Sequence, residues 1–110
     1  MQNIRTIGLL VIAGLAEISG AYLIWQWIRS GKSAWLGVLG LGALLVYSLT
    51  QTLQAFNFGR VFAAYGGVFI SLALIWGWLV DGQVPDQWDW LGASFALVGA
   101  AIILWGPRAV

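Results

Sequence analysis

The sequence predicts an all-α integral membrane protein with four transmembrane helices. Of its 110 residues, 61% are hydrophobic and only 8% are charged, and the mean hydropathy is +0.89. Four apolar stretches each approach the ~20 residues that a helix needs to cross a ~30 Å hydrocarbon core. The apolar runs are continuous rather than alternating, and four strands could not close a barrel, so helices are favoured over strands.

The predicted spans are residues 6–28, 34–53, 61–80 and 88–106. The loops between them are short and contain polar residues, glycine or proline, which end helices. Short loops force consecutive helices to run antiparallel. The expected architecture is therefore a four-helix membrane bundle in which residues 1–110 form a single transmembrane domain.

The composition excludes several classes of function. Cysteine and histidine are both absent, so no disulfide, thiol nucleophile or metal site using these ligands is expected. The five basic residues are scattered, which gives nucleic acid no electrostatic surface to bind. There is no candidate nucleophile–base pair, no pair of carboxylates in one span and no phosphate-binding motif. We therefore expect neither an enzyme nor a cofactor.

The tryptophans and the basic residues locate the membrane surfaces. All eight tryptophans lie near predicted span ends, as in the aromatic belts of membrane proteins. Arg5, Arg60 and Arg108 fall on the side of the termini, against Arg29 and Lys32 on the other side. This three-to-two balance barely orients the chain under the positive-inside rule. Two interpretations stay open: insertion in both orientations, or a small bias that still suffices to fix one.

Glu17 is the most informative residue, because it lies at the centre of the first span. No predicted span contains a lysine, arginine or histidine, and a carboxylate facing lipid would be strongly disfavoured. We expect Glu17 to face the interior, beside the small residues Gly14 and Gly20. Desolvation there favours the neutral acid and prepares the group to bind a proton or a cation. The alternative is a permanently protonated side chain that only holds helices together.

Three aromatic side chains of the third span are weaker candidates. Tyr65 lies in a run of small residues at 63–67, where it could line a cavity and offer a cation its ring face or a carboxylate its hydroxyl. Phe69 follows it by about one turn. Trp76 lies eleven residues after Tyr65 and shares its helical face at another depth. Packing or interface anchoring explains Tyr65 equally well, and Trp76 better.

The fourth span carries a pattern of small residues that is typical of close helix contacts in lipid. Its members recur at three- and four-residue spacing: Gly92, Ala96, Gly99 and Ala100, with Ile103 beyond. The partner could be another helix of the same chain. A homodimer that pairs fourth helices is more economical, since four helices enclose little space, and symmetry would bring two Glu17 side chains into one chamber.

Several motifs together resemble the YnfA family of small bacterial membrane proteins, over nearly the whole chain. They are Ala16-Glu17-Ile18-x-Gly20, Gly31-Lys32-Ser33, Gly59-Arg60-Val61, Ala64-Tyr65-Gly66-Gly67, Leu79-Val80-Asp81-Gly82, Gly99-Ala100-Ala101-Ile102-Ile103 and Gly106-Pro107-Arg108. That family is similar to the small multidrug resistance proteins of the drug/metabolite transporter superfamily, which share the chain's size, span count and embedded glutamate.

The resemblance implies a multi-pass protein of the bacterial inner membrane with dual topology and an antiparallel homodimer. It also implies proton-coupled export of cationic, often aromatic, compounds, with Glu17 binding proton and substrate in turn. Two features depart from the multidrug pattern. Val68 stands where many members have a tryptophan, which puts the substrate range in question, and the Gly-x-Gly kink is replaced by the slightly earlier Gly66-Gly67.

The resulting functional hypothesis is a proton-coupled antiporter of small organic cations. Its partners would be protons, the cationic substrate, the lipid bilayer and a second copy of the chain. An alternative from another class is a non-transporting membrane component that assembles with or modulates another membrane protein. In that case Glu17 and the glycines would serve packing alone.

Overall fold

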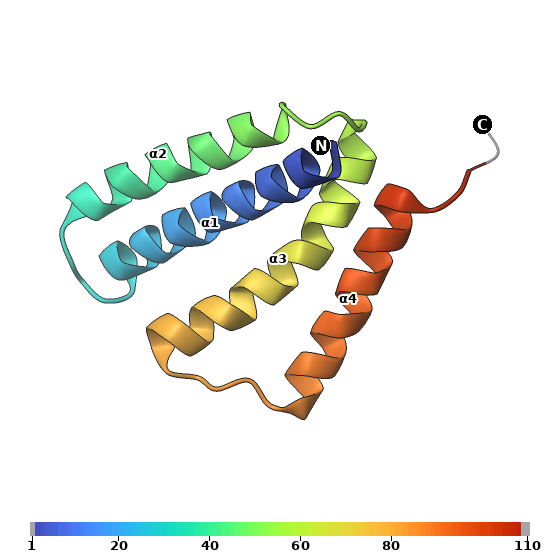
Figure 1. Cartoon of the computed structure of the whole chain (residues 1–110). Coiled ribbons are helices and arrows are strands. Elements are labelled where there is room, and N and C mark those ends of the chain that lie inside the picture. The colour runs from blue at the N-terminus through green and yellow to red at the C-terminus, as the bar shows by residue number, and fades with distance from the viewer. Residues whose placement is uncertain (1, 109–110) are drawn as a thin grey trace. The chain divides into compact units, whose positions relative to one another are not determined.

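Four α-helices account for most of the chain in the computed structural model, which describes residues 2–108 (Figure 1). They are α1 (Gln2–Ile28), α2 (Ala34–Gln51), α3 (Phe58–Asp81) and α4 (Gln87–Trp105). No strand occurs among the described residues. Each helix is long and apolar enough to cross a membrane. The predicted all-α fold with four spans is confirmed.

The helix ends follow from local hydrogen bonds. Asn57 precedes α3, and its side-chain oxygen accepts from the Arg60 backbone N–H at 3.0 Å. Asp86 precedes α4 and forms a reciprocal capping box with Asp89, with N···O distances of 2.9 and 3.0 Å. Such side-chain acceptors satisfy N–H groups that have no partner within the helix. Gly82 ends α3 with a positive φ of 74°, a conformation that glycine adopts without strain.

Several boundaries differ from the sequence-based expectation. α1 begins at Gln2 rather than at residue 6, because polar residues in its first turns do not stop a helix at the membrane surface. The Asn57 cap makes α3 begin at Phe58 rather than at residue 61. α2 ends at Gln51 rather than at residue 53, where the chain continues in tight turns with i→i−3 bonds from Thr52 and Leu53.

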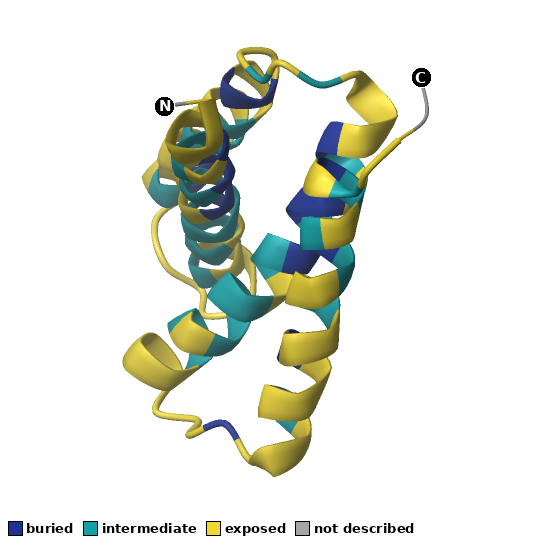
Figure 2. Cartoon of the chain, turned by 45° about the vertical axis from the view of Figure 1, so that its right-hand side comes forward, coloured by how far each residue is buried: buried dark blue, intermediate teal, exposed yellow. Residues whose placement is uncertain are grey.

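The chain divides into two compact units, Met1–Gln54 and Ala55–Val110. The first unit is the helical hairpin α1–α2, and the second is the hairpin α3–α4. Buried positions run along each helix as narrow stripes, and most of the remaining surface is exposed (Figure 2). Large apolar side chains such as Leu41 and Phe95 lie on this exposed surface, as expected for helices that face lipid.

Glycines close both hairpins by letting backbones approach. A Cβ atom at Gly20 would lie 2.8 Å from the Gly40 carbonyl oxygen, and one at Gly40 would lie 2.7 Å from the Gly20 carbonyl oxygen. In the second unit a Cβ at Gly67 would lie 2.5 Å from the Ala96 carbonyl oxygen and 2.9 Å from the Ala100 Cβ. Small residues at such contacts are the usual basis of close helix packing in lipid.

Candidate functional site

Glu17 lies on the row of α1 that faces α2. We define the α1–α2 seam as the residues that recur at alternating three- and four-residue spacing on both helices. On the α1 side these are Thr6, Leu10, Ala13, Glu17, Gly20, Ile24 and Trp27; on the other side they are Gly37, Gly40, Leu44, Tyr47, Gln51 and, just beyond α2, Gln54. Contacts support this register along its length, because Gly20 meets Gly40, Gly37 meets the Trp27 ring, and Gln54 bonds to Thr6.

The surroundings of Glu17 on the seam are small and apolar. Ala13, about one turn before it, has 0% of its surface exposed, and Gly20, three residues after it, is buried against Gly40. Glu17 itself is half-buried. An apolar helix contact offers a carboxyl group much less stabilisation than water does. Glu17 therefore lies on a helix contact whose neighbours at Ala13 and Gly20 are small and apolar.

Tyr47 belongs to this site although the sequence alone did not single it out. It is half-buried on α2, and its hydroxyl lies close enough to the Glu17 carboxylate to interact with it electrostatically. Counting along the antiparallel pair from the Gly20–Gly40 contact places Tyr47 within about one helical turn of the level of Glu17. If the pairing of Gly20 with Gly40 had been known from the sequence, the spacing of Gly40, Tyr47 and Gln51 would have placed Tyr47 on the seam.

The two predicted cavity-lining glycines of α1, Gly14 and Gly20, are both buried. At Gly20, the space that a side chain would take is filled by the Gly40 carbonyl group and by Leu44. Gly20 therefore lets α2 approach the α1 backbone, and the space at Gly20 itself is filled.

Tyr65 belongs to an aromatic row on α3. It is buried, with 5% of its surface exposed, and its ring centroid lies 5.5 Å from that of Phe69 and 6.2 Å from that of Phe62. Phe58 extends the row, 4.5 Å from Phe62. Trp76 lies two turns beyond Phe69 and is half-buried. The structure thus groups Tyr65 and Phe69 in the second unit, whereas Glu17 and Tyr47 lie in the first.

The small residues of α4 that were predicted at a dimer interface fall into two groups. Ala96 and Ala100 contact Gly67 of α3, so they serve the hairpin of their own chain. A Cβ atom added at Gly92 or Gly99 would meet no atom of the described residues within 4 Å, and Ile103 is half-buried. A surface along Gly92 and Gly99 therefore stays open to another helix, and the homodimer stays a prediction.

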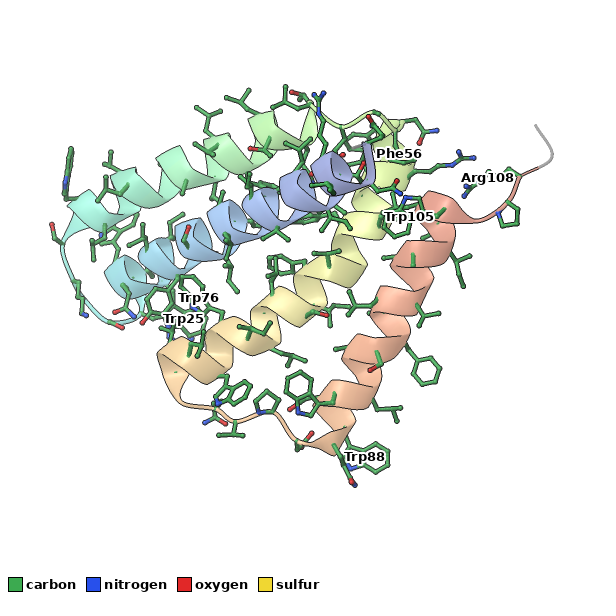
Figure 3. The ribbon with its side chains drawn as sticks, in the orientation of Figure 1. Trp25, Phe56, Trp76, Trp88, Trp105 and Arg108 are labelled. Carbon is green, nitrogen blue, oxygen red and sulfur yellow. The ribbon has the colours of Figure 1, made fainter. Side chains whose placement is uncertain are left out.

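Basic and aromatic side chains mark the ends of the helices. The Arg5 guanidinium donates to the Leu53 carbonyl at 3.3 Å, and that of Arg108 donates to the Ile103 carbonyl at 2.7 Å. Trp88 and Trp105 lie at opposite ends of α4 (Figure 3). Such positions suit the headgroup regions of a bilayer. Among the described residues no three acidic, histidine or cysteine side chains gather where they could hold a metal ion.

Comparison with known proteins gives a consistent match to one family. The family model described as "Uncharacterised BCR, YnfA/UPF0060 family" matches residues 3–109. UPF0060 membrane protein BH2744 of Halalkalibacterium halodurans is 58% identical over 101 residues, covering 91% of this chain and 94% of its own length. A UPF0060 membrane protein of Herpetosiphon aurantiacus is 57% identical over 110 residues, covering 98% and 100%. UPF0060 membrane protein YfjF of Bacillus subtilis is 55% identical over 104 residues, covering 94% and 95%. No solved structure matches the chain significantly.

Proposed function

The chain belongs to the YnfA/UPF0060 family of membrane proteins, and on this premise we propose that it is a proton-coupled antiporter. It exports small cationic or aromatic organic compounds across the bacterial inner membrane. Glu17 binds the proton and the substrate alternately.

The observation that carries this proposal is the place of Glu17 on the α1–α2 seam. A carboxyl group in the middle of a membrane helix is costly, and such groups are usually kept for ion or substrate binding. Here it stands between Ala13 and Gly20, within electrostatic reach of the Tyr47 hydroxyl. A phenol hydroxyl is a hydrogen-bond donor, and a donor near a carboxylate favours its charged form over the neutral acid.

Exchange follows from competition for one negative charge. When the carboxyl group is protonated, a cation finds no charge to bind, and when a cation is bound, the carboxylate holds no proton. Each ligand therefore displaces the other, and a proton gradient drives the cation in the opposite direction. The aromatic row around Tyr65 offers ring faces to a cationic or aromatic substrate, in keeping with cation–π attraction.

The working unit in this proposal is an antiparallel homodimer with dual topology. The Gly92 and Gly99 surface of α4 is open to a second copy, and the basic residues divide three to two between the membrane sides. Two oppositely inserted chains would play the part that inverted repeats play in larger transporters. Two lysines added near the N-terminus, or two in the loop at Gly31, should each fix one orientation. Co-expression of the two variants, but neither alone, should then support transport.

A second candidate is a non-transporting component that assembles with another membrane protein. The Gly20–Gly40 and Gly67–Ala96 contacts favour it, because they show how much of the small-residue content serves packing. In this case Glu17 would remain protonated as a hydrogen-bond donor.

Proton release separates the two candidates. Purified protein in weakly buffered detergent solution is mixed with tetraphenylphosphonium, an aromatic cation, and the pH change is recorded. The antiporter releases protons, and Glu17→Gln, which keeps the size of the side chain but cannot titrate, releases none. Asp81→Asn, at the end of α3, is the matched control and should behave as the unchanged protein. Equal release from the Glu17→Gln variant would remove Glu17 from the mechanism.

A further inference from the structure

A second polar group of the first unit lies apart from Glu17, at the end of the α1–α2 seam near the N-terminus. Thr6 is 1% exposed and Gln51 is 7% exposed. The Thr6 Oγ1, both amide atoms of Gln51 and the Gln54 Oε1 are buried and make no hydrogen bond within the part of the chain that the structure describes. Leaving such atoms without partners costs free energy for each group.

These side chains are held together by the end of the hairpin. The Gln54 Nε2 donates to the Thr6 carbonyl oxygen at 3.1 Å, which ties the turn after α2 to the first turns of α1. Gln51 precedes Gln54 on the same row of the seam. The Arg5 guanidinium donates to the Leu53 carbonyl at 3.3 Å beside this tie. We call Thr6, Gln51 and Gln54 the seam-end cluster.

Neighbouring hydroxyl groups show that this part of the chain can satisfy a polar side chain locally. The Thr50 Oγ1 donates to the Val46 carbonyl at 2.7 Å, and the Thr52 Oγ1 donates to the Leu49 carbonyl at 2.6 Å. Thr50 is nearly as buried as Gln51, at 8% exposed. The polar atoms of the seam-end cluster therefore differ from the Thr50 and Thr52 hydroxyls, because they make no hydrogen bond to a carbonyl of their own helix.

We propose that the seam-end cluster is an internal water-binding site. It presents acceptor oxygens from two amides, a donor from the Gln51 amide, and a hydroxyl that does both. A ligand must then donate and accept, be small and be uncharged, because the adjacent Arg5 disfavours a cation and the amide oxygens disfavour an anion. Water meets all these conditions, and buried waters typically make about three bonds to otherwise unsatisfied groups.

This site defines one end of a route to Glu17, an extension that rests on the proposed antiport. Thr6 and Glu17 lie on the same row of α1, about 16 Å apart along the helix axis. Between them the row carries only apolar side chains, Leu10 at 1% exposed and Ala13 at 0% exposed. In this extension the seam-end water passes protons toward Glu17 from the end of the seam near Thr6, and the Leu10 side chain separates the two.

The water site is tested by a double-mutant cycle that does not depend on transport. Thr6→Val and Gln51→Leu are made singly and together, and unfolding in mixed SDS micelles is followed by tryptophan fluorescence. Each single change should lower the ratio of folded to unfolded protein about tenfold, because the water is lost and its other partners are left without a hydrogen bond. The double change should cost little more than one, because both remove the same water.

Thr50→Val is the matched control for this cycle. Its hydroxyl is satisfied within α2, so its effect should add to that of Thr6→Val. A dry cluster would give the opposite sign: Gln51→Leu would raise the folded fraction, since it removes unpaired polar atoms, and the two changes would add. A stabilising Gln51→Leu, or additive effects of Thr6→Val and Gln51→Leu, would each overturn the water site.

The route is tested by proton leak in liposomes without substrate. Leu10→Ser should let water pass this position and collapse an imposed pH gradient, and the leak should vanish when Glu17→Gln is added. Ile12→Ser, on the exposed face of α1, is the control and should not leak. A Leu10→Ser variant that shows no proton leak overturns the route, even if the double-mutant cycle supports the water site. The proposed antiport is tested separately, by substrate-induced proton release, whose outcome does not depend on the water site or on the route.

Discussion

The two hairpins solve the same packing problem but carry different chemistry. Each closes where a glycine meets the backbone of its partner helix, Gly20 on Gly40 in the first unit and Gly67 on Ala96 in the second. The first hairpin then places a carboxyl group and buried amides along its contact row. The second carries aromatic rings on α3 instead. In the proposed antiporter the first unit would therefore carry the proton chemistry, whereas the second would supply packing and ring surfaces.

The largest effect is expected from filling the two glycine contacts. Gly20→Leu and Gly67→Leu should each lower the free energy of unfolding by about 2–3 kcal/mol, because the new side chain meets backbone atoms that cannot yield. Gly42→Leu and Gly77→Leu are the matched controls, since no described atom lies within 4 Å of the added Cβ. SDS titration measures all four. Equal losses at Gly42 and Gly20 would show that the hairpins do not depend on these contacts.

The assignment of proton chemistry to the first unit is tested by removing one tyrosine hydroxyl from each unit. Tyr47→Phe should weaken proton–cation exchange about tenfold and change its pH profile, because the hydroxyl interacts with the Glu17 carboxylate. Tyr65→Phe keeps the ring that packs against Phe69, so cation affinity should change little. Liposome uptake measured from about pH 6 to pH 9 distinguishes them. Matching pH profiles for both variants would contradict the assignment of proton chemistry to the first unit.

A smaller effect is expected on association, and it should be confined to the second unit. Gly99→Leu should weaken the homodimer about fivefold by separating the α4 backbones. Gly42→Leu places the same side chain on α2, where the space is equally open. Crosslinking yield against protein dilution compares the two. Equal weakening would move the interface away from α4.

The smallest effect concerns the helix caps. Asp86→Ala removes the side-chain acceptor of the capping box before α4, which bonds the Asp89 N–H at 2.9 Å, and should cost about 1 kcal/mol of stability. Ser33→Ala removes one longer bond, of 3.2 Å, before α2 and should cost less. Thermal unfolding followed by circular dichroism gives the order. A larger loss at Ser33 would show that the loop around Gly31 is more tightly coupled to its hairpin than its hydrogen bonds indicate.

The sequence predicts the helices well because apolar length alone determines a membrane span. It also identifies Glu17, since a lone carboxylate in such a span stands out against its neighbours. It does not identify Tyr47, because a tyrosine in an apolar helix carries no signal until the register with α1 is known. The role of Gly20 is missed for the same reason: a glycine beside a carboxylate suggests space, and only the position of Gly40 shows that the space is filled.

The boundary errors have a different origin. Predicted spans mark where hydrocarbon begins and ends, whereas a helix continues until its backbone finds another hydrogen-bond partner. Asn57 supplies such a partner before the apolar run of α3 begins, which extends the helix outward. The polar atoms of Gln51 lie within a predicted span, and hydropathy gives no indication that they are buried without partners among the described residues.

The reciprocal contact of Gly20 and Gly40 also limits how the chain can change over generations. Each residue is opposed by the other's carbonyl oxygen, and each already has the smallest side chain available. A harmful substitution at one position therefore has no compensating substitution at the other. Trimming Leu44 or Ile24 would relieve part of the crowding but leave the backbone oxygen in place. Suppressor screens that begin from Gly20→Ala should accordingly return true revertants far more often than second-site changes on α2.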